Sequence, residues 1–143
     1  MVAAIISGYY GLGDIPASIN PDKNATWFPL HAHWTSEKLA SKVDSGKILT
    51  LSPIFAVELD RDIYPEFVTG PFAWRTAHFV PENQRSILGV VAPEDLEAFL
   101  SKQPPSGILV GNEPGLEAPF LEYAEQYGYS PEKISSKQDI WLP

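Results

Sequence analysis

The last third of the chain alternates short apolar runs with helical patterns, and this alternation restricts the fold more than any other feature. Ser86–Val91 and Ile108–Val110 are short and apolar, which predicts buried strands. Between them, Pro93-Glu94-Asp95 predicts the start of a helix that runs to Lys102. Proline suits the first helical turn, and acidic side chains there favour the helix dipole. Strand, helix and strand in this order predict a parallel α/β layer.

The pattern continues to the end of the chain. Apolar residues at helical spacing predict a second helix from Leu116 to about Tyr127, capped by Gly128. Lys133–Ser136 and Asp139–Leu142 are expected to pair as an antiparallel hairpin. We therefore expect an α/β fold with a mostly parallel sheet, flanking helices and a C-terminal antiparallel hairpin. The expected architecture is a three-layer sandwich, with a two-layer form as the alternative.

The first two thirds are more broken, because the chain carries 14 Pro and 10 Gly. A helix is predicted over about His33–Val43 and a buried strand over Lys47–Ser52. Ile54–Leu59 is compatible with either strand or helix. We expect a long irregular insertion around residues 53–83, with one short helix near Phe72–His78.

Composition limits the classes of protein. With 143 residues and 44% apolar residues, the chain suits a single soluble domain over residues 1–143. Ten basic and 18 acidic side chains give a net charge of −8, which disfavours nucleic acid and anionic membranes. The absence of cysteine excludes disulfides, thiolate metal sites and a cysteine nucleophile.

Three features near the start of the chain could carry a function. Val2–Ile6 is either a buried strand or the remaining part of a transmembrane helix. The glycine-rich run Gly8–Gly13 lacks the Gly-Lys-Ser/Thr ending of a phosphate loop, so an ordinary loop is expected. His31 and His33 match no zinc spacing, even with Asp14 or Glu37 as a further ligand. We expect neither a metal nor a cofactor.

Candidate binding residues come from irregular segments, because long ordered loops often carry function. Charges gather around Glu58–Asp62, and aromatic, acidic and arginine side chains gather in residues 63–66 and 70–75. Residues 112–115 follow a predicted strand, at the edge where α/β sheets usually bind ligands. A structural role is open for each of these segments. The candidate contacts are Glu58, Tyr64, Glu66, Trp74, Arg75 and Glu113.

Several segments together resemble one family. They are Lys47–Pro53 with Glu58, Ile63–Arg75 and Pro105–Glu113, followed by Leu116–Pro119 and Tyr123–Tyr129. This combination resembles the soluble C-terminal region of bacterial multi-pass membrane glycosyltransferases that use polyprenyl-phosphate sugars. The resemblance implies a domain on the extracytoplasmic side of the inner membrane, next to the transmembrane part of its parent protein. The family's catalytic carboxylate lies between transmembrane helices, so no catalytic residue is assigned to this chain.

Three functions follow as hypotheses. The first is a non-catalytic accessory domain that helps to bind an acceptor or a lipid-linked sugar. The second is a free-standing hydrolase-like α/β enzyme that uses the Glu58–Asp62 carboxylates, which requires a deep pocket around them. The third is a protein-interaction domain, which an exposed apolar patch at Phe67, Phe72 and Trp74 would favour.

Overall fold

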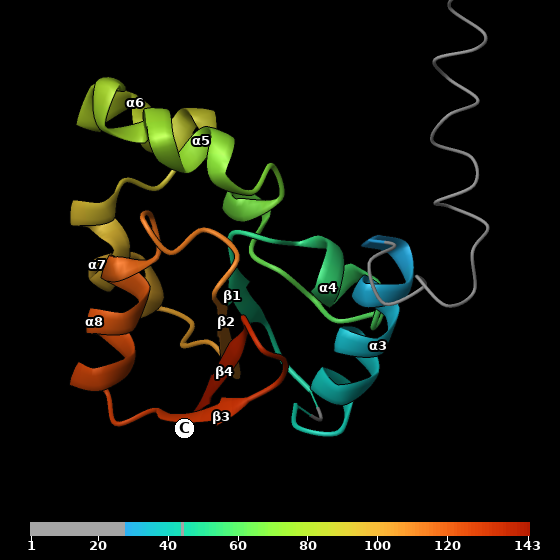
Figure 1. Cartoon of the computed structure of the whole chain (residues 1–143). Coiled ribbons are helices and arrows are strands. Elements are labelled where there is room, and N and C mark those ends of the chain that lie inside the picture. Colours follow the sequence, from blue (N-terminus) through green and yellow to red (C-terminus); the bar gives the residue numbers. More distant parts are fainter. Residues whose placement is uncertain (1–27, 44) are drawn as a thin grey trace, which may run out of the picture. The chain divides into compact units, whose positions relative to one another are not determined.

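The computed structural model describes residues 28–43 and 45–143 (Figure 1). The chain divides into two compact units, Met1–Trp34 and Thr35–Pro143. Of the first unit, the described residues form the start of helix α3, Phe28–Ala40. The predictions for Val2–Ile6 and Gly8–Gly13 lie outside the described residues. The sheet, its core and the pocket all belong to the unit Thr35–Pro143.

Most elements of this unit are short, as the many prolines and glycines suggest. Four strands and three 3-10 helices (η) accompany the α-helices of the described residues. After α3 come β1 (Ile48–Thr50), α4 (Ile54–Val57), η2 (Pro65–Phe67), α5 (Pro71–Thr76), η3 (Ala77–Phe79), α6 (Glu82–Leu88), η4 (Pro93–Asp95), α7 (Leu96–Leu100), β2 (Gly107–Val110), α8 (Ala118–Gln126), β3 (Ser130–Lys133) and β4 (Asp139–Leu142).

The strands form one mixed sheet in the order β1-β2-β4-β3. β1 and β2 are parallel, with Leu49 opposite Ile108. β4 pairs antiparallel with both β2 and β3. The α/β class and the C-terminal antiparallel hairpin are therefore confirmed. The first strand of the hairpin is Ser130–Lys133, however, and not Lys133–Ser136, because the N–H groups of Ile134 and Ser135 close the turn on the Gln138 carbonyl oxygen. The sheet is less parallel than expected, because only one of its three strand pairs is parallel.

The strand predicted over Ser86–Val91 is wrong. Residues Glu82–Leu88 form helix α6, which ends at Gly89 in the left-handed conformation with φ +63°. A short apolar run does not distinguish a strand from a helix by itself. Here Ile87 and Leu88 stay exposed, at 81% and 60%, so the run does not supply a buried strand. The sheet loses the parallel strand that this run was expected to add.

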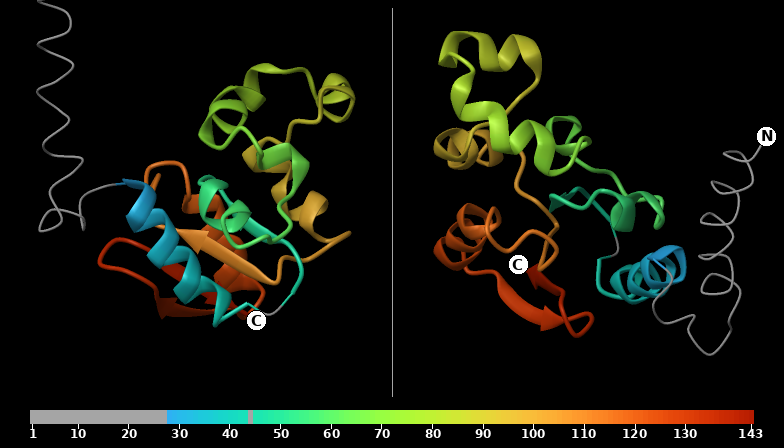
Figure 2. Two further views of the ribbon diagram at one scale, coloured as in Figure 1. Left: turned by 90° about the vertical axis from the view of Figure 1, so that its right-hand side faces the viewer. Right: turned by 45° about the horizontal axis from the view of Figure 1, so that its top comes forward.

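Residues 53–83 are less irregular than expected, because they contain α4, η2, α5 and η3. The ambiguous stretch after Pro53 is helical, and the short helix expected near Phe72 is confirmed as α5. Proline starts both η2 and α5, where its fixed φ suits the first turn. α5 and α6 lie together, away from the β3–β4 hairpin (Figures 1 and 2).

The main core lies on one face of the sheet. Alternation along the strands places Leu49, Ile108 and Val110 on this face. They pack with the buried side chains of α7, α8 and η2, which include Leu100, Phe120 and Phe67. α7 lies beside α8, where the Glu97 carboxylate accepts hydrogen bonds from Gln126 and Tyr127 (Figure 2). This packing brings η2 and α7 together, and residues of both helices line a pocket.

Candidate functional site

A pocket of about 710 Å³ is lined by residues of η2, α6, η4 and α7 and by Lys47 just before β1. This volume lies within the range of small-molecule sites. Its lining combines apolar groups with charged ones. The lining includes Lys47, Tyr64, Glu66, Arg85, Phe99 and Lys102.

Tyr64 and Phe99 form the aromatic wall of this pocket. Ile63 bridges to Ile48 of β1, which turns the neighbouring Tyr64 into the core, where it is 2% exposed. The Tyr64 ring meets Phe99 edge-on at 5.5 Å between centroids. Its hydroxyl donates a hydrogen bond of 2.7 Å to the Gln103 carbonyl oxygen. Burial raises the pKa of Tyr64, so the hydroxyl stays protonated and committed to that bond.

Arg85 fixes the α6 side of the pocket. Its Nε donates to the Val80 carbonyl oxygen at 2.9 Å, Nη1 pairs with Asp95 at 2.7 Å and Nη2 pairs with Glu94 at 2.7 Å. The hydrogen bond to Asp95 is the largest cause that raises the pKa of Arg85. Because α6 has no buried residue, the two ion pairs of Arg85 with η4 are the main polar contacts that hold this helix in place. They also use the positive charge of Arg85 within the protein.

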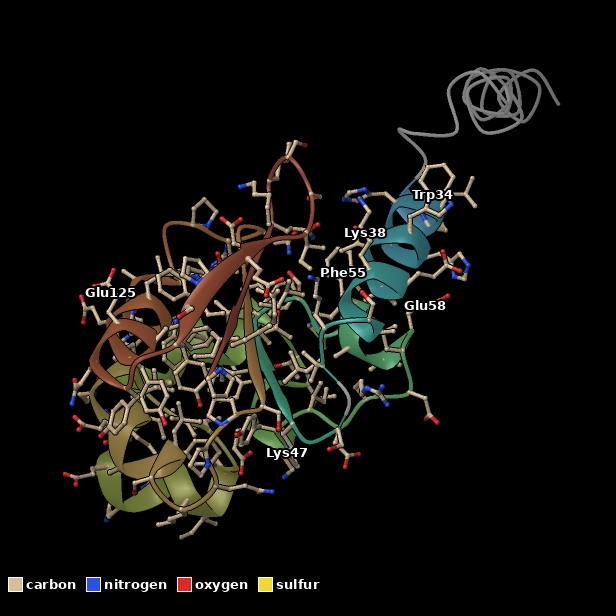
Figure 3. The ribbon with its side chains drawn as sticks, turned by 90° about the horizontal axis from the view of Figure 1, so that it is seen from below. Trp34, Lys38, Lys47, Phe55, Glu58 and Glu125 are labelled. Carbon is tan, nitrogen blue, oxygen red and sulfur yellow. The ribbon has the colours of Figure 1, made fainter. Side chains whose placement is uncertain are left out.

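Two lysines line the same pocket, and neither has a carboxylate partner among the described residues. The Lys47 ammonium lies 5.1 Å from the centroid of the Tyr64 ring, a cation–π contact. Lys102 lies two residues beyond the end of α7, next to Gln103. Among the described residues, neither lysine forms an ion pair. Figure 3 shows Lys47 well apart from Glu58, which lies beside α4.

The structure separates the candidates from the sequence into three places. Tyr64 and Glu66 line the pocket. Glu58 is exposed at the end of α4 and is not among the described residues that line the pocket. The remaining three candidates meet around α5, described next.

Trp74, Arg75 and Glu113 join α5 to the loop that follows β2. The Trp74 indole N–H donates to the Leu116 carbonyl oxygen at 3.0 Å, and the side chain is 3% exposed. Arg75 pairs with the Glu113 carboxylate at 2.9 Å on the surface. Trp74 is therefore a core side chain, whereas the Arg75–Glu113 pair is open to solvent.

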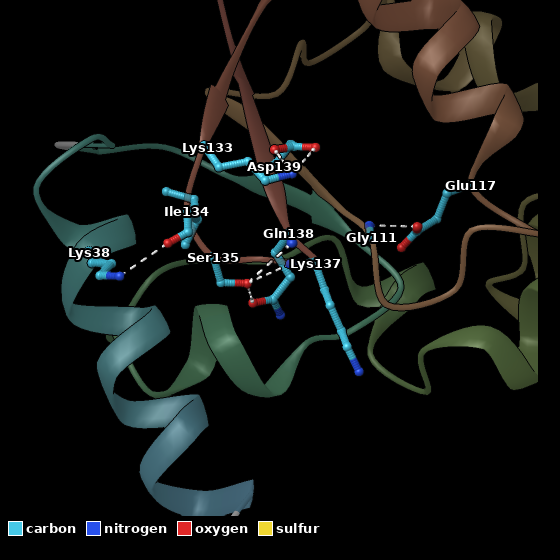
Figure 4. A network of polar contacts seen from close by, with 9 residues as sticks. All are labelled: Lys38, Gly111, Glu117, Lys133, Ile134, Ser135, Lys137, Gln138 and Asp139. Atoms are coloured by element: carbon cyan, nitrogen blue, oxygen red, sulfur yellow. Dashed lines mark hydrogen bonds and ion pairs between the residues drawn. The ribbon is translucent and has the colours of Figure 1, made fainter. Parts of the chain in front are cut away.

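The same loop is held from inside by a carboxylate that the sequence did not single out. Glu117 is 1% exposed, and its Oε2 accepts a hydrogen bond of 2.7 Å from the Gly111 N–H (Figure 4). Burial raises the pKa of Glu117, although backbone N–H groups of the loop favour the charged form. Gly111 has φ +111°, and a Cβ there would overlap the Lys137 carbonyl oxygen. The loop after β2 is therefore closed by the protein's own groups.

A second polar cluster holds this loop to the β3–β4 turn. Gln138 is fully buried and donates from Nε2 to the Asn112 side-chain oxygen at 3.0 Å. Its own side-chain oxygen accepts from the Ser135 hydroxyl at 2.9 Å (Figure 4). Both the nitrogen and the oxygen of this amide therefore bond to other groups of the protein. We therefore assign the cluster a structural role.

Arg85, Phe99, Lys47 and Lys102 are pocket residues that the sequence did not indicate. The partners of Arg85 were visible as the acidic start of a predicted helix, Glu94 and Asp95. The two lysines carry no such signal, since nothing local marks a lysine that will face a pocket. Their role depends on how η2, α6 and α7 fold together.

Comparisons with protein-family models, with curated proteins and with solved structures find no match to the chain. None of the helices in residues 28–43 and 45–143 is both long and apolar enough to cross a membrane. Within the same residues, no three His, Asp or Glu side chains are grouped so that they could hold a metal ion. The pocket lined by η2, α6, η4 and α7 is therefore the feature that bears on function.

Proposed function

We propose that this chain is a non-catalytic binding domain whose pocket takes a small polyhydroxylated ligand of the sugar class. In the frame of the resemblance, it serves as an extracytoplasmic accessory domain of a membrane glycosyltransferase. There it assists the binding of an acceptor or of a lipid-linked sugar. The same proposal includes helices on both faces of the sheet, as in a three-layer sandwich.

The observation that carries the proposal is the mixed lining of the 710 Å³ pocket. Sugar rings present apolar C–H faces and many hydroxyls, so they need apolar walls beside both donors and acceptors. Tyr64 and Phe99 supply the wall, Lys47 and Lys102 supply donors, and Glu66 supplies an acceptor.

The hydrolase-like alternative is less well supported. Glu58, Asp60 and Asp62 are exposed, and none of them is among the described residues that line the pocket. General acid–base catalysis by paired carboxylates needs them in a shielded site with different surroundings. The structure gives these three side chains no such enclosure.

A protein-interaction function has one specific observation in its favour. The patch expected at Phe67, Phe72 and Trp74 does not form, because Phe67 and Trp74 are each 3% exposed. Other large apolar side chains are exposed on the same part of the chain: Phe72, Phe79, Ile87 and Leu88. Exposed apolar groups of this kind are typical of contact surfaces, so a contact with the parent protein is compatible with the binding proposal.

The test is ligand-observed NMR with the 143-residue chain and a panel of mono- and disaccharides. We expect weak saturable binding that is lost in Ala98→Trp, which fills the pocket from an exposed position of α7. Ala118→Trp on α8 is the matched control, because Ala118 is exposed and does not line the described pocket. Binding that survives Ala98→Trp would reject this pocket as the site. Sugar transfer by the chain alone would reject its non-catalytic role.

A further inference from the structure

The pocket has an uneven balance of charge along its length. Three cations and three carboxylates line it, and the Arg85–Asp95 pair cancels one of each. That leaves Lys47 and Lys102 against Glu66 and Glu82. Among the described residues, none of these four forms an ion pair. Their distribution within the pocket therefore decides what a ligand meets.

The segments that carry the two lysines meet at Tyr64, at one end of the pocket. The Lys47 ammonium lies over the Tyr64 ring, and the Tyr64 hydroxyl is bonded to Gln103, the residue after Lys102. Tyr64 thus links the segments that carry both lysines. The Arg85–Asp95 pair marks the other end, because the five residues of α7, roughly 7.5 Å of helix, separate Asp95 from the turn that carries Lys102.

The carboxylates offset only one of the two lysine charges at this end. Glu82 lies on α6, one helical turn before Arg85, and so belongs to the end that the Arg85–Asp95 pair marks. Glu66 lies in η2 near Tyr64, but no ion pair joins it to Lys47 or Lys102 among the described residues. Because the Tyr64 hydroxyl is already committed to Gln103, the lysine ammonium groups are the charged donors left at this end.

We propose that this end is an anion subsite, at which Lys47 and Lys102 bind a carboxylate or phosphate group carried by the ligand. The proposal rests on the proposed function and narrows its ligand class to acidic or phosphorylated sugars. Bonds between ammonium groups and anionic oxygens are stronger than those to neutral hydroxyls. The aromatic wall beside Lys47 excludes water from one side of the ammonium group, which strengthens its attraction for an anion.

The net charge of −8 makes this subsite a local feature that works against the field of the whole chain. Anions are repelled at long range and attracted only within the pocket. Selectivity should therefore depend on the two lysines, and affinity for an anionic ligand should fall as salt screens them.

The experiment compares three probes of similar ring size: glucose, glucuronate and glucose 1-phosphate. Each is titrated into the 143-residue chain and into Lys47→Met, Lys102→Met and the double variant. Methionine keeps an unbranched apolar stem without the charge. Lys137→Met is the matched control, since Lys137 is exposed in the β3–β4 turn, outside the described pocket lining. Thermal unfolding checks that each variant is folded, and Lys102→Met serves alone if the double variant is not.

We expect both anionic sugars to bind about tenfold more tightly than glucose, because charge-assisted bonds exceed neutral ones by this order. The advantage should disappear in the double variant and persist in Lys137→Met. Glucuronate and glucose 1-phosphate distinguish a carboxylate from a phosphate as the preferred group.

Three results would overturn the subsite. If glucose binds and the anionic sugars bind no better, the anion subsite is wrong while the proposed function stands. If the anionic sugars bind better but the lysine variants keep that advantage, the anion binds elsewhere. Should none of the three probes bind at all, the proposed function and the subsite fail together.

Discussion

Replacing Trp74 tests whether this side chain is part of the core or of a binding surface. In the structure its indole N–H bonds to the Leu116 carbonyl oxygen at 3.0 Å. Its ring lies 5.5 Å from Phe67 and 5.1 Å from Phe120, centroid to centroid. The side chain is 3% exposed, so the substitution acts on buried contacts, namely this hydrogen bond and the packing of the rings.

The expected cost follows from these contacts. Trp74→Phe loses one hydrogen bond, about 1 kcal/mol, and part of the packing with two rings, about 1 kcal/mol more. The sum is about 2 kcal/mol of unfolding free energy. Trp74→Ala removes the whole ring system and should cost about 3–5 kcal/mol. These are large fractions of the stability of a single domain.

The assay is urea unfolding followed by far-UV circular dichroism, with the slope of free energy against urea compared between variants. Phe72→Ala is the matched control: it is an aromatic residue of the same helix but 72% exposed, so a change below about 0.5 kcal/mol is expected. If Trp74→Ala costs no more than Phe72→Ala, the assignment of Trp74 to the core is wrong. Ligand binding in Trp74→Phe should be unchanged.

The remaining predictions concern the loop after β2. Gly111→Ala should cost about 3 kcal/mol or more, or prevent folding, because of its positive φ and the overlap with the Lys137 carbonyl oxygen; in urea unfolding, Gly115→Ala, where a Cβ meets open space, should change little. Burial raises the pKa of Glu117, so in the window above the ordinary carboxyl pKa the folded state binds more protons, and stability falls as pH rises. Glu117→Gln should remove that dependence at pH values above the ordinary carboxyl pKa, and parallel pH profiles of the two proteins would contradict this. A double-mutant cycle on Arg75 and Glu113 should give a coupling below about 1 kcal/mol that decreases with salt, since the pair is exposed; a larger, salt-independent value would show a shielded pair.

The parts of the fold that could be predicted are those with local signals. Ile108–Val110 and the last strand, Asp139–Leu142, form as expected, because apolar runs next to turn residues identify them. The other hairpin strand is polar and exposed, and it lies three residues before its predicted position. Ser86–Val91 has the same local signal, but its first half, Ser86–Leu88, is helical. Its outcome depends on Gly89 as a helix cap and on the contacts of Arg85 with η4, which only the folded chain brings together.

The candidate site shows the same limit. Tyr64 and Glu66 were chosen for residue type in an irregular segment, and both line the pocket. Trp74 is a candidate on the same grounds but is not among the described residues that line the pocket, because sequence does not reveal which buried aromatic side chain borders a pocket. Lys47 and Lys102 are 55 residues apart in sequence. Their approach to one end of the pocket depends on long-range packing.

Helix α6 forms one wall of the pocket, yet it buries none of its own side chains. Core residues are constrained by packing, whereas exposed helical positions tolerate exchange with little loss of stability. Apart from Arg85, the positions of this helix are therefore free to vary without endangering the rest of the domain. Evolution, or an engineer, could change what the pocket prefers by rewriting this single helix while the sheet and its core stay as they are.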